Sequence, residues 1–138
     1  MAHKQYMNGM KVYFCHARDF DYQNDLYKPI RESELNTQYD IIFPHEDGAP
    51  AFKSKEVIKE CGVVLAEVSF PATGLGIELG WADMYGVPII CFYKRGSKVS
   101  GSLQYLTDDI VEYSDARDLV EKVYSALSSS SQKEDEGK

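Results

Sequence analysis

Glu78 is the residue of this chain whose type and position best suit covalent chemistry. It follows a loop that holds a proline and two glycines, and its neighbours Ile77 and Leu79 are apolar. We expect a helix to begin at Gly76, which puts the Glu78 carboxylate in the first helical turn. The helix dipole and the loop amides would keep a carboxylate ionised there, as a nucleophile must be. The alternative is a glutamate that only complements the helix dipole, which is a common placement.

The glycines near Glu78 do not form a dinucleotide-binding fingerprint. Gly74, Gly76 and Gly80 are spaced as GxGxxxG rather than GxGxxG, and they follow the third predicted strand rather than the first. Small residues ahead of a helix still let a ligand approach the backbone closely. Gly74 and Gly76 are therefore candidate substrate-binding residues.

Apolar runs and helical periodicity define the elements that must position Glu78. Five runs predict strands, at residues 11–15, 39–43, 63–68, 89–93 and 110–113. Helices are expected near residues 19–30, 53–61, 76–85 and 116–127, with a helical turn at 102–106. Pro29 should kink or break the first of these helices.

This alternation of strands and helices predicts the fold class α/β. We expect a single-domain, doubly wound, five-stranded parallel sheet of flavodoxin-like or Rossmann-like type, with strand order 2-1-3-4-5. Ligands bind such sheets beyond the carboxyl ends of the strands, where the strand order reverses. The loops after the first and third strands meet Glu78 there. They and their flanks supply three candidate substrate-binding residues, Cys15, His16 and Ser69.

The composition fits one globular domain of 138 residues, with 43% apolar and 27% charged residues. We expect a flexible N-terminus at residues 1–10, a folded domain at 11–128 and a disordered polar tail at 129–138. The formal net charge of −7 argues against a polymeric nucleic acid as partner, although it is compatible with a small nucleotide. The sequence shows no signal peptide, no membrane-length apolar stretch and no CxxC pair, so we expect a cytoplasmic location, reduced thiols, and neither cofactor nor metal.

Residues 66–80, AEVSFPATGLGIELG, resemble the signature of the nucleoside 2-deoxyribosyltransferase superfamily, which includes the 2'-deoxynucleoside 5'-monophosphate N-glycosidases. Residues 12–15 look like its first strand, residues 21–28 are similar to the opening of its first helix, and the match covers roughly residues 11–125. The resemblance implies that Glu78 attacks the anomeric carbon and forms a covalent glycosyl-enzyme as the base leaves, which is the logic of a retaining glycosidase. It also implies that Tyr13 orients Glu78 by a hydrogen bond.

The resemblance implies cleavage of the N-glycosidic bond of (deoxy)nucleosides, with the sugar passed to a second nucleobase. One alternative is hydrolysis of (deoxy)nucleoside 5'-monophosphates, which releases the free base. Another is a non-catalytic nucleotide-binding module on the same fold. A flavodoxin-like electron carrier is a weaker alternative, because no Ser/Thr-rich phosphate loop follows the first strand.

The sequence departs from the superfamily pattern at Ser54, where an aspartate commonly contacts the sugar or assists the leaving base. A serine cannot donate a carboxylic proton. His45, Glu46 and Asp47 in the loop after the second strand are candidates to replace that aspartate, and the alternative for each is a solvated loop residue.

Two further loops bear on substrate and assembly. Arg18 can meet a 5'-phosphate but Asp19 would repel one, so the loop after the first strand favours neither nucleotides nor nucleosides. The resemblance implies that a serine of the loop at residues 94–102, Ser100 or Ser102, reaches the site of a neighbouring subunit. That arrangement requires a homodimer or a larger assembly, whereas the alternative is an ordinary surface loop.

Overall fold

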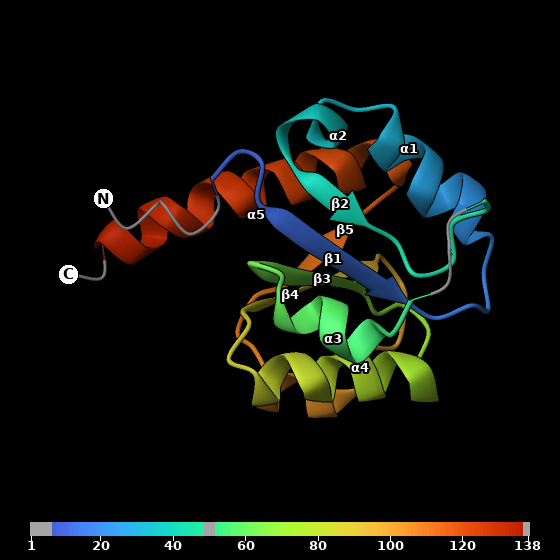
Figure 1. The fold of residues 1–138 in the computed structure, drawn as a ribbon. Helices are drawn as coiled ribbons and strands as arrows, with labels where there is room; N and C mark the ends of the chain where they lie inside the picture. Colours follow the sequence, from blue (N-terminus) through green and yellow to red (C-terminus); the bar gives the residue numbers. More distant parts are fainter. Residues whose placement is uncertain (1–6, 49–51, 137–138) are drawn as a thin grey trace.

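The computed structural model describes residues 7–48 and 52–136, with side chains up to Ser128. Its centre is one five-stranded parallel sheet in the order β2-β1-β3-β4-β5, between two layers of helices (Figure 1). The strands are β1 (Lys11–His16), β2 (Asp40–Ile42), β3 (Val63–Glu67), β4 (Ile89–Lys94) and β5 (Ile110–Tyr113). The predicted fold class and strand order are confirmed.

The helices divide between the two faces of the sheet. One face carries the π-helix η2 (Gln23–Tyr27), α1 (Lys28–Arg31), α2 (Leu35–Gln38) and α5 (Ala116–Glu136). The other face carries α3 (Ser54–Lys59), α4 (Thr73–Met84) and the 3-10 helix η3 (Gly101–Tyr105). We call these the α5 face and the α4 face.

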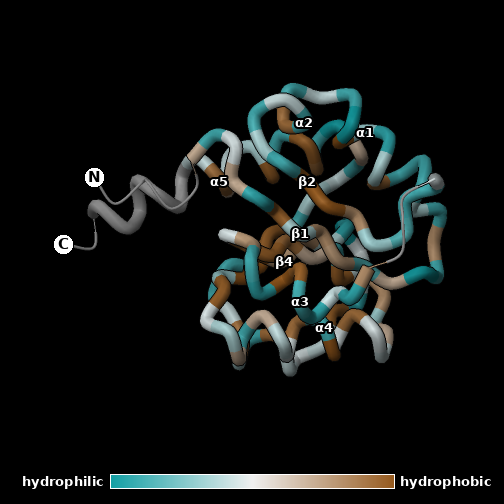
Figure 2. Tube along the Cα trace, in the orientation of Figure 1, coloured by the Kyte–Doolittle hydropathy of each residue, from teal (hydrophilic) through white to brown (hydrophobic). Residues whose placement is uncertain are grey.

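Each face of the sheet buries its own apolar cluster, because successive side chains of a strand point to opposite faces. In β1, Val12 and Phe14 join the cluster under α5, whereas Tyr13 and Cys15 join the cluster under α4. The hydrophobic colours of Figure 2 accordingly gather on the strands between the helix layers. A polar side chain at the end of a strand is thus committed to one face and one set of neighbours.

Helix α4 begins at Thr73, three residues before the predicted start at Gly76. Pro71 disfavours helical backbone only for the residue before it, so the helix can begin shortly after it. Gly74 and Gly76 therefore lie inside the helix, where an added Cβ at either glycine, or at Gly80, would meet no atom within 4 Å. The prediction that Glu78 lies in the first turn is wrong, since it lies in the second turn.

The first predicted helix is broken at Pro29, as expected. A π-helical segment, Gln23–Tyr27, gives way there to α1, and Pro29 is the second residue of α1. A proline is tolerated at that position, because the N–H groups of a first turn have no intrahelical partner. The short helix α2 was not predicted.

Helix α5 continues to Glu136, past Leu127, the last apolar residue of its predicted face. Gln, Lys and Glu, which are good helix formers, follow in this stretch. Near the N-terminus, the Gly9 amide donates to the Gln38 carbonyl (2.6 Å). The prediction of a flexible N-terminus at residues 1–10 falls partly on residues 1–6, which lie outside the described residues.

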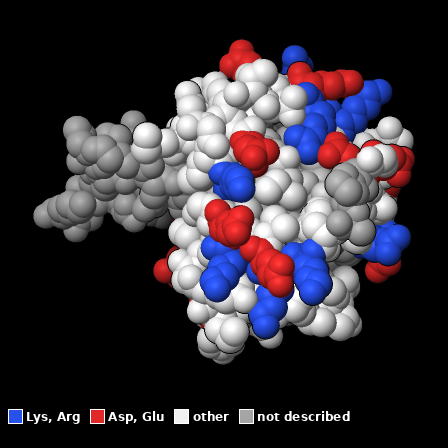
Figure 3. All heavy atoms as spheres, viewed as in Figure 1, with Lys and Arg blue, Asp and Glu red and all other residues white. Residues whose placement is uncertain are grey.

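The described helices include none that is long and apolar enough to cross a membrane. In Figure 3, Lys and Arg side chains alternate with Asp and Glu over the face that carries α1 and α3. The described residues of that face form no continuous basic area of the kind that a nucleic-acid polymer needs.

Candidate active site

Strand β1 and helix α4 bring Tyr13 and Glu78 into direct contact on the α4 face. The Tyr13 hydroxyl donates to Glu78 Oε2 at 2.7 Å, and Ser54 Oγ lies 3.2 Å from the same hydroxyl. Burial, followed by the hydrogen bond to Glu78, raises the pKa of Tyr13 well above its usual value, so the phenol stays protonated. Three of the predicted site residues therefore form one cluster, with the strand-borne phenol between a carboxylate and a serine.

Phe52 lies beside this cluster, at the entrance to α3. Its ring stands edge-on to the ring of Tyr13, with centroids 6.4 Å apart and an interplanar angle of 82°. It is 37% exposed, whereas Tyr13 is fully buried. Sequence reasoning missed Phe52, and the only available signal was an apolar residue just before a predicted helix.

A second chain of contacts runs from the end of β1 to the loop after β2. His16 Nδ1 lies 2.6 Å from the Ala17 carbonyl oxygen, which can only accept, so Nδ1 carries the proton. His16 Nε2 must then accept the hydrogen bond from the Tyr27 hydroxyl, also at 2.6 Å. Burial lowers the pKa of His16 to about 4, which keeps this ring neutral near pH 7.

The Tyr27 oxygen in turn anchors the loop after β2, because it accepts the backbone N–H of His45 at 3.1 Å. Desolvation lowers the pKa of His45, Arg18 lowers it further, and Glu78 opposes both. Burial raises the pKa of Tyr27, with Glu78 among the smaller causes. The charge of Glu78 thus acts on both His45 and Tyr27.

The other two candidates on this loop have different surroundings. Glu46 forms a bidentate pair with Arg31, at 2.8 Å and 2.9 Å, and so is already engaged. Asp47 is exposed, and the segment that follows it, residues 49–51, lies outside the described residues. Of the three residues proposed to replace the missing aspartate, His45 is the one whose backbone is held by Tyr27.

Cys15 lies beneath the site rather than at its surface. Its side chain is fully buried and its thiol donates to the Leu65 carbonyl at 3.5 Å. Burial raises the pKa of Cys15 well above its usual value, and the charge of Glu78 raises it further. The thiol therefore borders Glu78 electrostatically without being open to a substrate.

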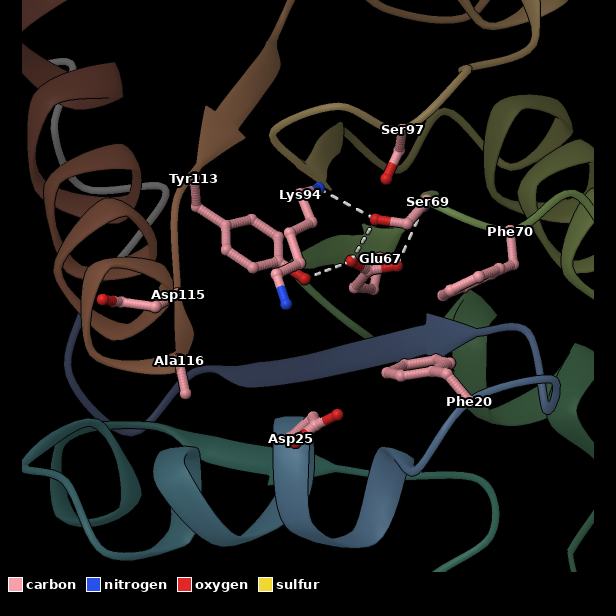
Figure 4. A pocket seen from close by; sticks show the side chains of 10 residues that line it. All are labelled: Phe20, Asp25, Glu67, Ser69, Phe70, Lys94, Ser97, Tyr113, Asp115 and Ala116. Atoms are coloured by element: carbon pink, nitrogen blue, oxygen red, sulfur yellow. Dashed lines mark hydrogen bonds between the residues drawn. The ribbon is translucent and has the colours of Figure 1, made fainter.

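Ser69 lines a cavity whose wall includes Tyr113 of β5 and Ala116 of α5 (Figure 4). Its hydroxyl donates to Glu67 Oε2 at 2.6 Å and its amide donates to Glu67 Oε1 at 2.9 Å. The Tyr113 hydroxyl also donates to Glu67 Oε2, and the Lys94 amide donates to Ser69 Oγ at 2.8 Å. This network closes one side of a cavity of about 150 Å³ and joins the ends of β3, β4 and β5.

Glu67, which is 1% exposed, was missed as a polar centre. Its one signal in the sequence is a charge at the end of an apolar strand. The wall of the same cavity includes Phe20 and Phe70, whose rings stack at 5.3 Å.

Ser100 and Ser102 face a separate apolar cavity of about 240 Å³, together with Gly76, Leu79 and Leu103. Residues two apart in an α-helix project in nearly opposite directions, about 200° apart. Gly76 and Glu78 therefore lie on opposite sides of α4. Glu78 is not among the residues that line the cavity of the two serines, and Gly74 is exposed in the first turn of α4.

Comparison with known proteins gives one curated relative and several solved structures of similar fold. No model of a known protein family matches the chain. A protein from Thermofilum pendens named "Putative 2'-deoxynucleoside 5'-phosphate N-hydrolase 1" is 33% identical over 76 residues. The predicted resemblance to the nucleoside 2-deoxyribosyltransferase superfamily is confirmed. The aligned part is 51% of this chain and spans about half, 53%, of that relative.

Solved structures share the fold of this chain. The CMP N-glycosidase BcmB of Clostridium botulinum superposes with a TM-score of 0.56 and 18% identity, covering 83% of this chain and 98% of that one. A conserved protein from Enterococcus faecalis V583 gives a TM-score of 0.54 and 16% identity, covering 84% and 98% respectively. At these identities the two structures support the shared architecture alone.

Proposed function

We propose that this chain hydrolyses the N-glycosidic bond of a nucleoside 5'-monophosphate, with Glu78 as the nucleophile. The observation that carries the proposal is the 2.7 Å contact between Tyr13 and Glu78 at the edge of the sheet where doubly wound folds bind ligands. Transfer of the sugar to a second base was the first expectation from the sequence and hydrolysis the alternative. The names of the Thermofilum relative and of BcmB favour hydrolysis.

The reaction runs in two steps with Glu78 at the centre. Oε2 is held by Tyr13, and Oε1 has no hydrogen-bond partner among the described residues, so Oε1 is the free oxygen. In the first step a bond forms from Oε1 to the anomeric carbon, and the base leaves with the electrons of the glycosidic bond and takes up a proton. In the second step water attacks the same carbon, gives up a proton and frees Glu78.

The leaving base needs that proton, and Ser54 cannot supply a carboxylic one. His45 is our candidate, because the Tyr27 hydroxyl anchors its backbone and, against the desolvation that lowers its pKa, the charge of Glu78 favours its protonated form. Phe52 offers a partly exposed aromatic ring beside Tyr13, and planar bases stack on such rings. Together they would hold the base next to the carboxylate.

A cation at the mouth of the site would favour the binding of a 5'-phosphate. Arg18 follows β1, and its charge lowers the pKa of both His16 and His45. Arginine suits phosphate because its planar group can donate two parallel hydrogen bonds. This favours a monophosphate over a nucleoside, despite Asp19 next in the chain.

We also propose that the active assembly is a homodimer or larger. Ser100 and Ser102 line a cavity that does not include Glu78, which supports a role for them in the site of a neighbouring subunit. Exposed Ile77 and Met84 lie on the same helix, and such apolar side chains favour a partner surface. Light scattering coupled to size-exclusion chromatography checks this, and a monomer at micromolar concentration would contradict it.

The test of the function is chromatographic detection of free base. The protein is incubated with CMP, dGMP or deoxyinosine, each with and without free adenine, alongside Glu78→Gln and the control Glu56→Gln on exposed α3. We expect base from a monophosphate without adenine, lost in Glu78→Gln and kept in the control. A new nucleoside that forms only with adenine would instead establish a transferase. Ligand binding with no base released would favour the non-catalytic module that Ser54 motivates.

A further inference from the structure

Three oxygens of the Tyr13 cluster share a limited number of protons. The Tyr13 oxygen lies 2.7 Å from Glu78 Oε2 and 3.2 Å from Ser54 Oγ, both within hydrogen-bond distance. A phenol has one proton to donate, and an ionised carboxylate has none. The proton of Tyr13 therefore goes to the closer, charged acceptor, which is Glu78. The remaining contact is satisfied only if the Ser54 hydroxyl donates to the Tyr13 oxygen.

We infer that Ser54 is a positioning residue: its hydroxyl donates to the Tyr13 oxygen, so the proton of Tyr13 is donated to Glu78. This arrangement suits a site that holds a single carboxylate. Ser54 acts through Tyr13 and need not touch the substrate. The inference rests on the proposed function in that Glu78 is the nucleophile. The inference gives Ser54 a role that differs from that of the aspartate which commonly stands at this position in the superfamily.

The surroundings of Ser54 support this role. Serine near a helix start usually caps the helix by accepting a backbone N–H. Here Ser54 is the first residue of α3, and neither it nor the N-cap residue Lys53 makes a side-chain capping bond. Its hydroxyl is thus available to Tyr13. The Ser54 contact is also the one influence that lowers the pKa of Tyr13, as expected when a hydroxyl donates to the phenol oxygen.

The chain of donors strengthens the contact that matters for attack. When a hydroxyl accepts one hydrogen bond, it becomes a better donor in the next. Ser54 therefore makes Tyr13 a stronger donor to Glu78 Oε2 and restrains the phenol from rotating away. A well-held Oε2 fixes the plane of the carboxylate, and with it the direction of Oε1.

An aspartate at position 54 would reverse this arrangement. Its carboxylate would compete with Glu78 for the single proton of Tyr13. It would also lie within roughly 4–6 Å of Glu78, the range in which one carboxylate raises the pKa of another. Glu78 would then share the Tyr13 hydrogen bond with a second carboxylate, and it would have a negative charge close by.

The experiment compares five proteins: wild type, Ser54→Ala, Ser54→Thr, Ser54→Asp and the uncharged isostere Ser54→Asn. Two readouts are taken, the pH dependence of kcat and the titration of Glu78 by carbon NMR on labelled glutamate, assigned by its loss in Glu78→Gln. We expect kcat to fall about fivefold in Ser54→Ala, the worth of one hydrogen bond. We expect Ser54→Thr to restore it to within about twofold, since the hydroxyl is kept.

The aspartate variant gives the sharper result. We expect both the Glu78 titration and the acid limb of kcat to move up by about one pH unit or more in Ser54→Asp but not in Ser54→Asn. Equal titrations in all five proteins would overturn the inference, as would a rise of kcat in Ser54→Asp. The titration needs no turnover. It therefore tests the hydrogen bonds from Ser54 to Tyr13 and from Tyr13 to Glu78 separately, even if Glu78→Gln keeps its activity and the proposed function is refuted.

Discussion

Removing the hydroxyl of Tyr113 tests whether the buried Glu67 network holds the strand ends together. Tyr113 is 6% exposed and donates to Glu67 Oε2, while Ser69 donates to both carboxylate oxygens. A hydrogen bond to a charged group contributes about 1.5–3 kcal/mol to stability. The two Ser69 bonds remain in Tyr113→Phe, so we expect a loss toward the lower end, about 1.5–2 kcal/mol in the free energy of unfolding.

The measurement is urea denaturation followed by far-ultraviolet circular dichroism. The matched control is Tyr93→Phe, because the Tyr93 hydroxyl donates to exposed Glu112 at 3.4 Å and exposed pairs contribute at most about 1 kcal/mol. We expect the urea midpoint of Tyr113→Phe to fall at an unchanged slope, with little change in the control. Equal losses in the two variants would refute the reasoning, since burial would then not decide the strength of the contact.

Two further predictions concern charge. The pKa of His16 is lowered to about 4 from an ordinary 6.5, so the unfolded chain binds the proton more tightly. Stability should therefore fall by about 2 kcal/mol between pH 7.5 and pH 5, and His16→Gln should lack this part of the loss in urea titrations at the two pH values; identical pH dependence in both proteins would contradict it. Arg18→Gln should raise the KM for a monophosphate about tenfold or more, while Lys98→Gln should not, in steady-state base-release assays. An unchanged KM would remove Arg18 from phosphate binding.

The strand pattern made much of the fold predictable. Apolar runs located all five strands to within two residues at either end, and the crossover rules then left one common strand order. The contact between Tyr13 and Glu78 was expected from the family resemblance instead, since topology alone does not distinguish Tyr13 from an ordinary strand aromatic. The strands and their order need only local periodicity and topology.

The predictions that failed depend on three-dimensional neighbours. The start of α4 was placed too late because Gly74 and Gly76 suggest a loop, and only the packing of Leu75 and Leu79 shows that the helix includes them. The contact between Glu67 and Tyr113 joins residues 46 apart. No sequence spacing predicts this contact, because it depends on how the sheet and its helices pack in three dimensions.

The three glycines of α4 have an entropic consequence. Each costs a helix about 0.5–1 kcal/mol relative to alanine, so Gly74, Gly76 and Gly80 together weaken α4 by roughly 1.5–3 kcal/mol. The segment that carries Glu78 would therefore unravel if it were separated from the sheet. The burial of Leu75 and Leu79 against the sheet keeps the helix folded. The alignment of the Glu78 carboxylate therefore depends on the assembled core rather than on the helix alone.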